Sequence, residues 1–123
     1  MLTKAQTQPI RDMLQAAQWH FEDDEKRLGS QKLWDATVAA LTLIAEERGW
    51  ACKTEDDHWV IIDHLTAGYS DPEEAWLDAG YGTALDLQEY AAGGFAEDYE
   101  FIVAVPGGIG FVRELLKIAE QSA

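Results

Sequence analysis

The sequence contains a single cysteine, three prolines and no long apolar run. One cysteine, Cys52, excludes a disulfide within the chain and any zinc site built from cysteines alone. No apolar run approaches the roughly 20 residues that a membrane-spanning helix needs, and the polar residues 1–12 predict no signal peptide. With 123 residues, of which 47% are hydrophobic, residues 1–123 are the size of one domain with its own core. We therefore expect a cytoplasmic protein that is not inserted in a membrane.

Basic residues are scarce in the middle of the chain. The whole sequence has 9 basic and 23 acidic residues, a net charge of −14, and no lysine or arginine occurs from Thr54 to Val112. Residues 53–100 hold one basic and 13 acidic residues, a net charge of −12. Such a segment repels phosphates, so nucleic acids and anionic membranes are not expected partners. It is a solvated surface that keeps the chain in solution, a face for a basic protein partner, or a mimic of nucleic acid.

The first half of the chain has the apolar spacing of two helices. The first is predicted over residues 10–28, with Pro9 near its first turn and Gly29 as its stop. Its apolar face consists of Ile10, Leu14, Ala17, Phe21 and Leu28. Ser30 is the predicted N-cap of the second helix, which ends at Gly49. The short connection indicates an antiparallel pair.

Two further helices are predicted from their capping signals. Thr54 and Asp57 resemble a capping box, which favours a helix over residues 54–66, although its Trp-Val-Ile-Ile run is also good strand sequence. The run Asp71-Pro72-Glu73-Glu74 predicts a helix start, with Asp71 as the cap and the proline at the first position. Two glycines, Gly93 and Gly94, predict the end of that helix.

The C-terminal region permits two interpretations. In one, a helical segment that begins near Ala96 is broken or kinked at Pro106-Gly107-Gly108, and a last helix covers residues 109–121. In the other, residues 99–105 form a strand, followed by a glycine-rich loop that would suit an anion. The phosphate-loop pattern ends in Gly-Lys-Ser or Gly-Lys-Thr, which this loop lacks. The sequence leaves open whether residues 99–105 are helix or strand.

The second predicted helix carries two runs that resemble a known family. It begins with Gln31-Lys32-Leu33-Trp34-Asp35-Ala36 and ends with Ala45-Glu46-Glu47-Arg48-Gly49. These runs look like the Lys-x-Trp-x-Ala and Ala-Glu-x-Arg-Gly runs of the PaREP1 group in the HEPN superfamily of helical bundles. The resemblance covers about residues 10–105. It implies an all-α antiparallel bundle of four or five helices, often dimeric.

For catalysis, the resemblance implies a degenerate member. HEPN ribonucleases carry an arginine followed a few residues later by histidine, and residues 71–92 contain neither. Members of the group often show a His and an Asn in the fourth helix, where this chain has Asp86 and Gln88, although Tyr90 is kept. A ribonuclease needs a base, an acid or a cation near the scissile phosphate. Asp86 and Tyr90 are therefore only weak catalytic candidates.

Two other sets of residues are candidate sites. Asp57, His58 and His64 lie close in sequence and are weak metal-ligand candidates, although they do not match a His-x-x-x-His pair. Five tryptophans are many for this length, and Trp19 and Trp50 are candidates for a partner surface, since aromatic residues are enriched in interface centres. No cofactor is predicted.

Together these observations predict an all-α, HEPN-like antiparallel bundle of about five helices. We expect a non-catalytic interaction module, either homodimeric or bound to a separate, basic protein. The alternatives are a divergent HEPN-type ribonuclease or a metal-dependent hydrolase. A small-molecule site between helices leaves little trace in sequence and also stays open.

Overall fold

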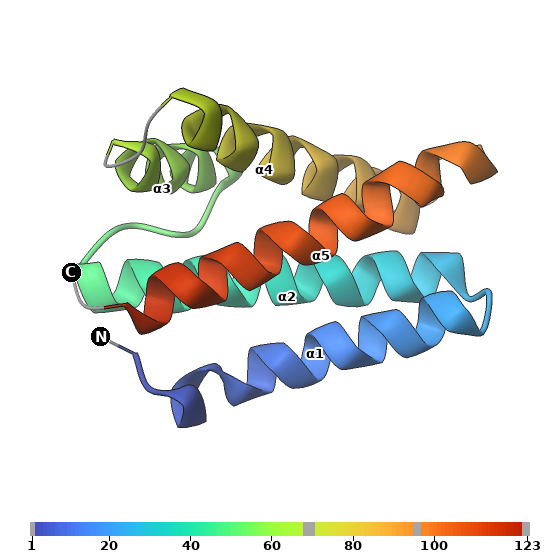
Figure 1. Cartoon of the computed structure of the whole chain (residues 1–123), viewed down its shortest axis with the longest axis horizontal. Coiled ribbons are helices and arrows are strands. Elements are labelled where there is room, and N and C mark those ends of the chain that lie inside the picture. Colours follow the sequence, from blue (N-terminus) through green and yellow to red (C-terminus); the bar gives the residue numbers. More distant parts are fainter. Residues whose placement is uncertain (1, 68–70, 95–96, 122–123) are drawn as a thin grey trace.

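The computed structural model describes residues 2–67, 71–94 and 97–121, with the backbone alone for residues 71–75. Its elements are α1 Lys4–Glu22, α2 Lys26–Arg48, α3 Glu55–Thr66, α4 Asp71–Ala91 and α5 Asp98–Glu120. The helix α2 lies at the centre and packs against α1, α4 and α5, while α3 packs mainly on α4 (Figure 1). The predicted all-α bundle of five helices is confirmed. No helix in these described ranges is long and apolar enough to span a bilayer.

The turn between α1 and α2 lies earlier than predicted. The first helix ends at Glu22, and Asp24 adopts a left-handed backbone with φ of 60° before α2 begins at Lys26. Gly29 and Ser30, the predicted stop and cap, are instead buried inside α2. A Cβ at position 29 would lie 2.8 Å from the Phe21 ring, so this glycine permits close packing of α1 and α2.

The start of α1 also differs from its prediction. Thr3 and Gln6 form a capping box, so the helix begins at Lys4 rather than near residue 10. Pro9 consequently lies inside the helix rather than in its first turn. It is tolerated because it is exposed, and water can solvate the carbonyl that its missing N–H leaves free.

The capping box of α3 is confirmed, whereas the cap predicted for α4 is corrected. The Thr54 hydroxyl accepts from the Asp57 amide at 3.1 Å, and α3 is a helix rather than the alternative strand. The helix α4 begins at Asp71, so this residue is helical rather than the predicted cap, and the residue before it lies outside the described ranges. It ends at Ala91, and Gly93 follows with φ of 115°.

The C-terminal helix α5 confirms the helical interpretation of residues 99–105, and it corrects the alternative strand and the predicted break. Residues 99–105 are helical, and the helix continues without interruption through Pro106-Gly107-Gly108. Pro106 is exposed, so the carbonyl that it leaves unpaired can be hydrated. A Cβ at Gly108 would lie 2.9 Å from the Leu33 side chain and 3.0 Å from that of Leu87. The glycine that was expected to break the helix instead lets α5 approach α2 and α4.

The core lies along α2 and is closed by α4 and α5. Its largest fully buried side chains include Leu33, Leu41, Ile44, Leu77, Tyr81, Phe111, Val112 and Leu115. Polar contacts join the two ends of the chain beside this core. The Leu2 amide donates to the Ala119 carbonyl at 3.0 Å, the Thr7 hydroxyl donates to Glu120 at 2.7 Å, and Arg11 pairs with Glu120. These contacts fix α1 against the last turn of α5.

Candidate functional site

His58, a metal-ligand candidate, is part of a buried aromatic cluster. Its Nδ1 lies 2.8 Å from the hydroxyl of Tyr81, and both residues are buried. Trp34 packs edge-on against the imidazole, and Trp59 packs edge-on against the Tyr81 ring. The hydrogen bond satisfies the polar atoms that burial removes from water. His58 therefore has a structural partner inside the domain.

Burial also sets the protonation of this pair. It lowers the pKa of His58 below its ordinary 6.5, against the opposing influence of the Asp57 and Glu55 carboxylates. It raises the pKa of the Tyr81 hydroxyl well above its ordinary range. The pair is therefore neutral at physiological pH.

A stability loss in mild acid follows from the lowered pKa of His58. The unfolded histidine binds a proton as pH falls through about 6.5, whereas the folded one resists it, so stability is full above that pH and lost below it. We expect the wild type to lose more unfolding free energy than His58→Gln between about pH 7.5 and about pH 5.5, measured by urea denaturation. His64→Gln is the control, since His64 is exposed. Equal losses in the wild type and His58→Gln would contradict the prediction.

The other two metal-ligand candidates do not join His58. The Asp57 carboxylate accepts from the backbone amides of Lys53 and Thr54, which lowers its pKa. His64 stacks on the Trp50 ring at a centroid distance of 4.6 Å. Within the described ranges, no three His, Cys, Asp or Glu residues are grouped so that they could hold a metal ion.

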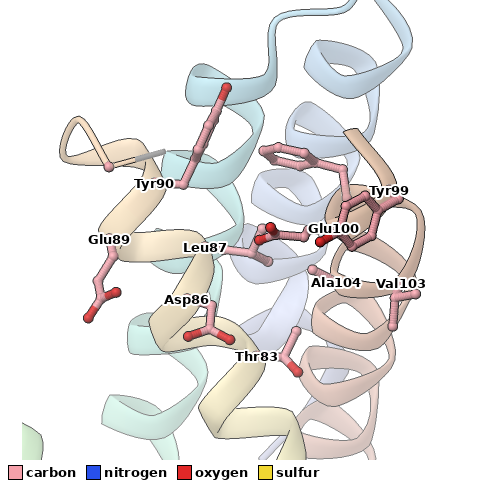
Figure 2. Close-up of a pocket in the computed structure, with 11 residues that line it drawn as sticks. Thr83, Asp86, Leu87, Glu89, Tyr90, Tyr99, Glu100, Val103 and Ala104 are labelled. Atoms are coloured by element: carbon pink, nitrogen blue, oxygen red, sulfur yellow. The ribbon is translucent and has the colours of Figure 1, made fainter. Parts of the chain in front are cut away.

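Asp86 and Tyr90 lie in a cavity between α4 and α5. Figure 2 shows them on α4, with Tyr99, Glu100 and Val103 on α5. The cavity has a volume of about 540 Å³. It is lined by Thr83, Asp86, Leu87, Glu89, Tyr90, Gly94, Tyr99, Glu100, Phe101, Val103 and Ala104. We call this cavity the α4–α5 groove.

The α4–α5 groove is acidic. Three acidic residues line it, Asp86, Glu89 and Glu100, and none of the residues that line it is a lysine, arginine or histidine. The two nearby cations come from α2 and are already engaged. Lys26 pairs with Asp98 at 2.7 Å, and Arg27 donates to the backbone carbonyls of Tyr90 and Gly94. The groove therefore presents acidic residues beside apolar and aromatic walls.

An exposed apolar ridge borders the groove. It consists of Tyr99, Ile102, Val103 and Pro106 on α5, and we call it the α5 ridge. The first three are 68%, 74% and 75% exposed, although their type favours burial. Sequence reasoning missed the ridge because helical spacing does not show whether an apolar stripe faces a core or solvent. The signal that could have found it is the presence of two apolar faces on α5. One face holds Phe101 and Ala104, and the other holds the ridge, whereas a helix at the surface of a bundle buries only one face.

The two tryptophans predicted for a partner surface differ in exposure. Trp19 is 60% exposed on α1, but it is a single aromatic residue between polar neighbours in the sequence. Trp50 is half-buried, lies against the core and is covered by His64 and Arg48. Neither extends the α5 ridge.

The candidate site is therefore the α4–α5 groove with the α5 ridge beside it. It contains Asp86 and Tyr90 but not the three metal-ligand candidates on α3. Its chemistry combines apolar contact with attraction for positive charge. No family model, curated protein or solved structure matches this chain, so the geometry of the chain itself defines the site.

Proposed function

We propose that this chain is a cytoplasmic, non-catalytic interaction module, a HEPN-like bundle that binds a separate protein on the α5 ridge. The observation that carries the proposal is the exposure of Tyr99, Ile102 and Val103 on one helix face. Burying one aliphatic side chain of this size contributes about 1.5–3 kcal/mol. A partner that covers the ridge therefore gains affinity from each of these residues.

Charge favours a separate protein over a second copy. A twofold dimer through the ridge would bring the same groove of each copy together. Asp86, Glu89 and Glu100 of both copies would then lie at one interface, and the chain carries a net charge of −14. Like charges opposed across an interface cost several kcal/mol. The ridge therefore suits a partner of different charge.

The chemistry of the groove supports binding rather than phosphodiester cleavage. Asp86 has tyrosines, carboxylates and apolar side chains around the same cavity. Cleavage of RNA needs positive charge to stabilise the charge that develops on the phosphate, and the groove lining contains acidic residues but no lysine, arginine or histidine. The replacement of the family's His and Asn by Asp86 and Gln88 agrees with the same proposal.

Photo-crosslinking in the native host tests the proposal. We expect benzoylphenylalanine at position 103 to form one reproducible adduct with a second protein, because Val103 is three-quarters exposed on the ridge. The matched control is position 60 on α3, where Val60 is 52% exposed away from the groove. Mass spectrometry identifies the adducts. Equal adducts at both positions, none at either, or an adduct with a second copy of the chain would contradict the proposal.

A further inference from the structure

We infer that the segment bound at this site is an amphipathic helix, apolar along one face, with lysine or arginine along its edges. The inference rests on the proposed function and names the chemistry of the partner. It follows from the shape of the α5 ridge, the charge of the α4–α5 groove, and the way this domain already holds two cations at the end of that groove.

The shape of the ridge fits a helix. Tyr99, Ile102, Val103 and Pro106 occupy positions i, i+3, i+4 and i+7, the spacing of a helix face that packs along another helix. The opposite face of the same helix is occupied, since Phe101 is buried and packs edge-on against Tyr90. A partner helix laid along the ridge would thus extend the bundle by one element.

The groove attracts positive charge at the edge of that partner helix. Asp86 and Glu89 come from α4, and Glu100 comes from the first turn of α5. Neither Asp86 nor Glu89 has an ion pair with any described residue. A helix with apolar residues on the ridge would place its flanking residues beside these carboxylates, where lysine or arginine is favourable and glutamate is not.

The domain already binds two of its own cations at the end of this groove in the same manner. Arg27 lies 4.3 Å from the centre of the Tyr90 ring and donates to backbone carbonyls beside it. Lys26 lies 5.5 Å from the centre of the Phe101 ring and pairs with Asp98. Each cation combines an aromatic face with an oxygen acceptor. Tyr99 offers a ring to a cation of the partner, and Glu100, whose Oε1 accepts from the Glu97 amide, offers its second carboxylate oxygen.

A synthetic helix tests this inference. The probe is a fluorescein-labelled peptide with leucine at helical a and d positions and lysine at the flanking positions; the comparison peptide has glutamate in place of lysine. We expect the intact protein to bind the lysine peptide at least about tenfold more tightly than the glutamate peptide in fluorescence anisotropy. Ile102→Ser with Val103→Ser should weaken lysine-peptide binding about tenfold or more. Asp86→Asn with Glu89→Gln should weaken it by about threefold to tenfold and reduce its salt dependence.

Matched variants on α3 separate a specific site from general attraction. Val60→Ser removes exposed apolar surface elsewhere, and Asp56→Asn with Asp63→Asn makes the same charge change on another exposed helix. Both should keep lysine-peptide affinity within about twofold, since neither lies on the groove. Circular dichroism and urea midpoints confirm that every variant is folded.

Three results would overturn the inference. They are no binding of the lysine peptide, equal binding of both peptides, or equal weakening by the α3 and groove charge variants. If the lysine peptide does not bind but position 103 still crosslinks to another protein, the proposed function stands. The partner then has a different chemistry from the one inferred here. A wild-type dimer in sedimentation that Ile102→Ser with Val103→Ser converts to monomer would instead assign the ridge to self-association.

Discussion

Replacing Tyr81 with alanine is expected to lower the free energy of unfolding by about 3–5 kcal/mol, the usual cost of removing a buried aromatic ring. Tyr81 is fully buried, and its ring contacts those of Trp34, His58, Trp59 and Phe111. It therefore joins side chains from α2, α3, α4 and α5. Since domains are usually stable by about 5–15 kcal/mol, this variant would be marginally folded. Urea denaturation followed by circular dichroism measures the loss.

Tyr81→Phe isolates the contribution of the hydroxyl. It keeps the ring but leaves the buried Nδ1 of His58 without its partner, which costs about 1–3 kcal/mol. The control is Tyr99→Phe, which removes a hydroxyl from an exposed ring and should change stability by less than about 0.5 kcal/mol. If both variants proved equally stable, the hydrogen bond between His58 and Tyr81 would not contribute to the fold.

Two glycines of α4 are expected to respond to alanine with opposite signs. A Cβ at Gly80 would lie 2.5 Å from the ring of Phe111, which is fully buried and cannot move aside freely. Gly80→Ala should therefore destabilise the domain by about 1–3 kcal/mol through overpacking. A Cβ at Gly82 would meet nothing within 4 Å, so Gly82→Ala should stabilise α4 by about 0.5–1 kcal/mol through helix propensity.

The pair serves as its own control because both changes add the same methyl group to the same helix. Urea midpoints of the two variants, measured against the wild type, give the two signs directly. Equal effects would mean that propensity alone governs α4. A stable Gly80→Ala variant would mean that Phe111 repacks without cost, contrary to the close approach of α4 and α5 in the structure.

Features set by residues close in sequence were predictable. The capping box of Thr54 and Asp57 spans a single turn, and Gly49 and Gly93 adopt the left-handed backbone that favours glycine after a helix. These signals depend on local hydrogen bonds and on backbone sterics. Neither depends on where another helix lies, so the sequence contains all the information that they need.

Gly29 and Gly108 were misread because their role is tertiary. Glycine ends helices or lets them approach, and the sequence pattern is the same in both cases. Gly29 of α2 accommodates Phe21 of α1, and Gly108 of α5 accommodates Leu33 of α2, so each glycine makes room for a side chain of another helix. Only the packing of α1, α2 and α5 decides between the two roles.

The candidate site was predictable in part. Asp86 and Tyr90 were singled out as weak catalytic candidates, and they do lie in the α4–α5 groove. The α5 ridge was not predicted, because an apolar stripe that faces a core and one that faces solvent have the same spacing. Whether such a stripe on α5 is buried or exposed depends on how many other helices cover α5. This is a property of the assembled bundle.

The central place of α2 has a consequence for how the protein emerges from the ribosome. The α1–α2 hairpin is complete once Arg48 has been made, but α4 and α5, which cover its inner face, come later in the chain. At about 5–20 residues per second, that face waits several seconds for its cover. Leu33, Leu41 and Ile44 are fully buried in the folded chain, and we expect them to be exposed on the nascent chain during this interval. We therefore expect chaperone engagement and aggregation to be concentrated before synthesis of α5 is complete at Glu120, since Gly108 lets this helix pack against Leu33.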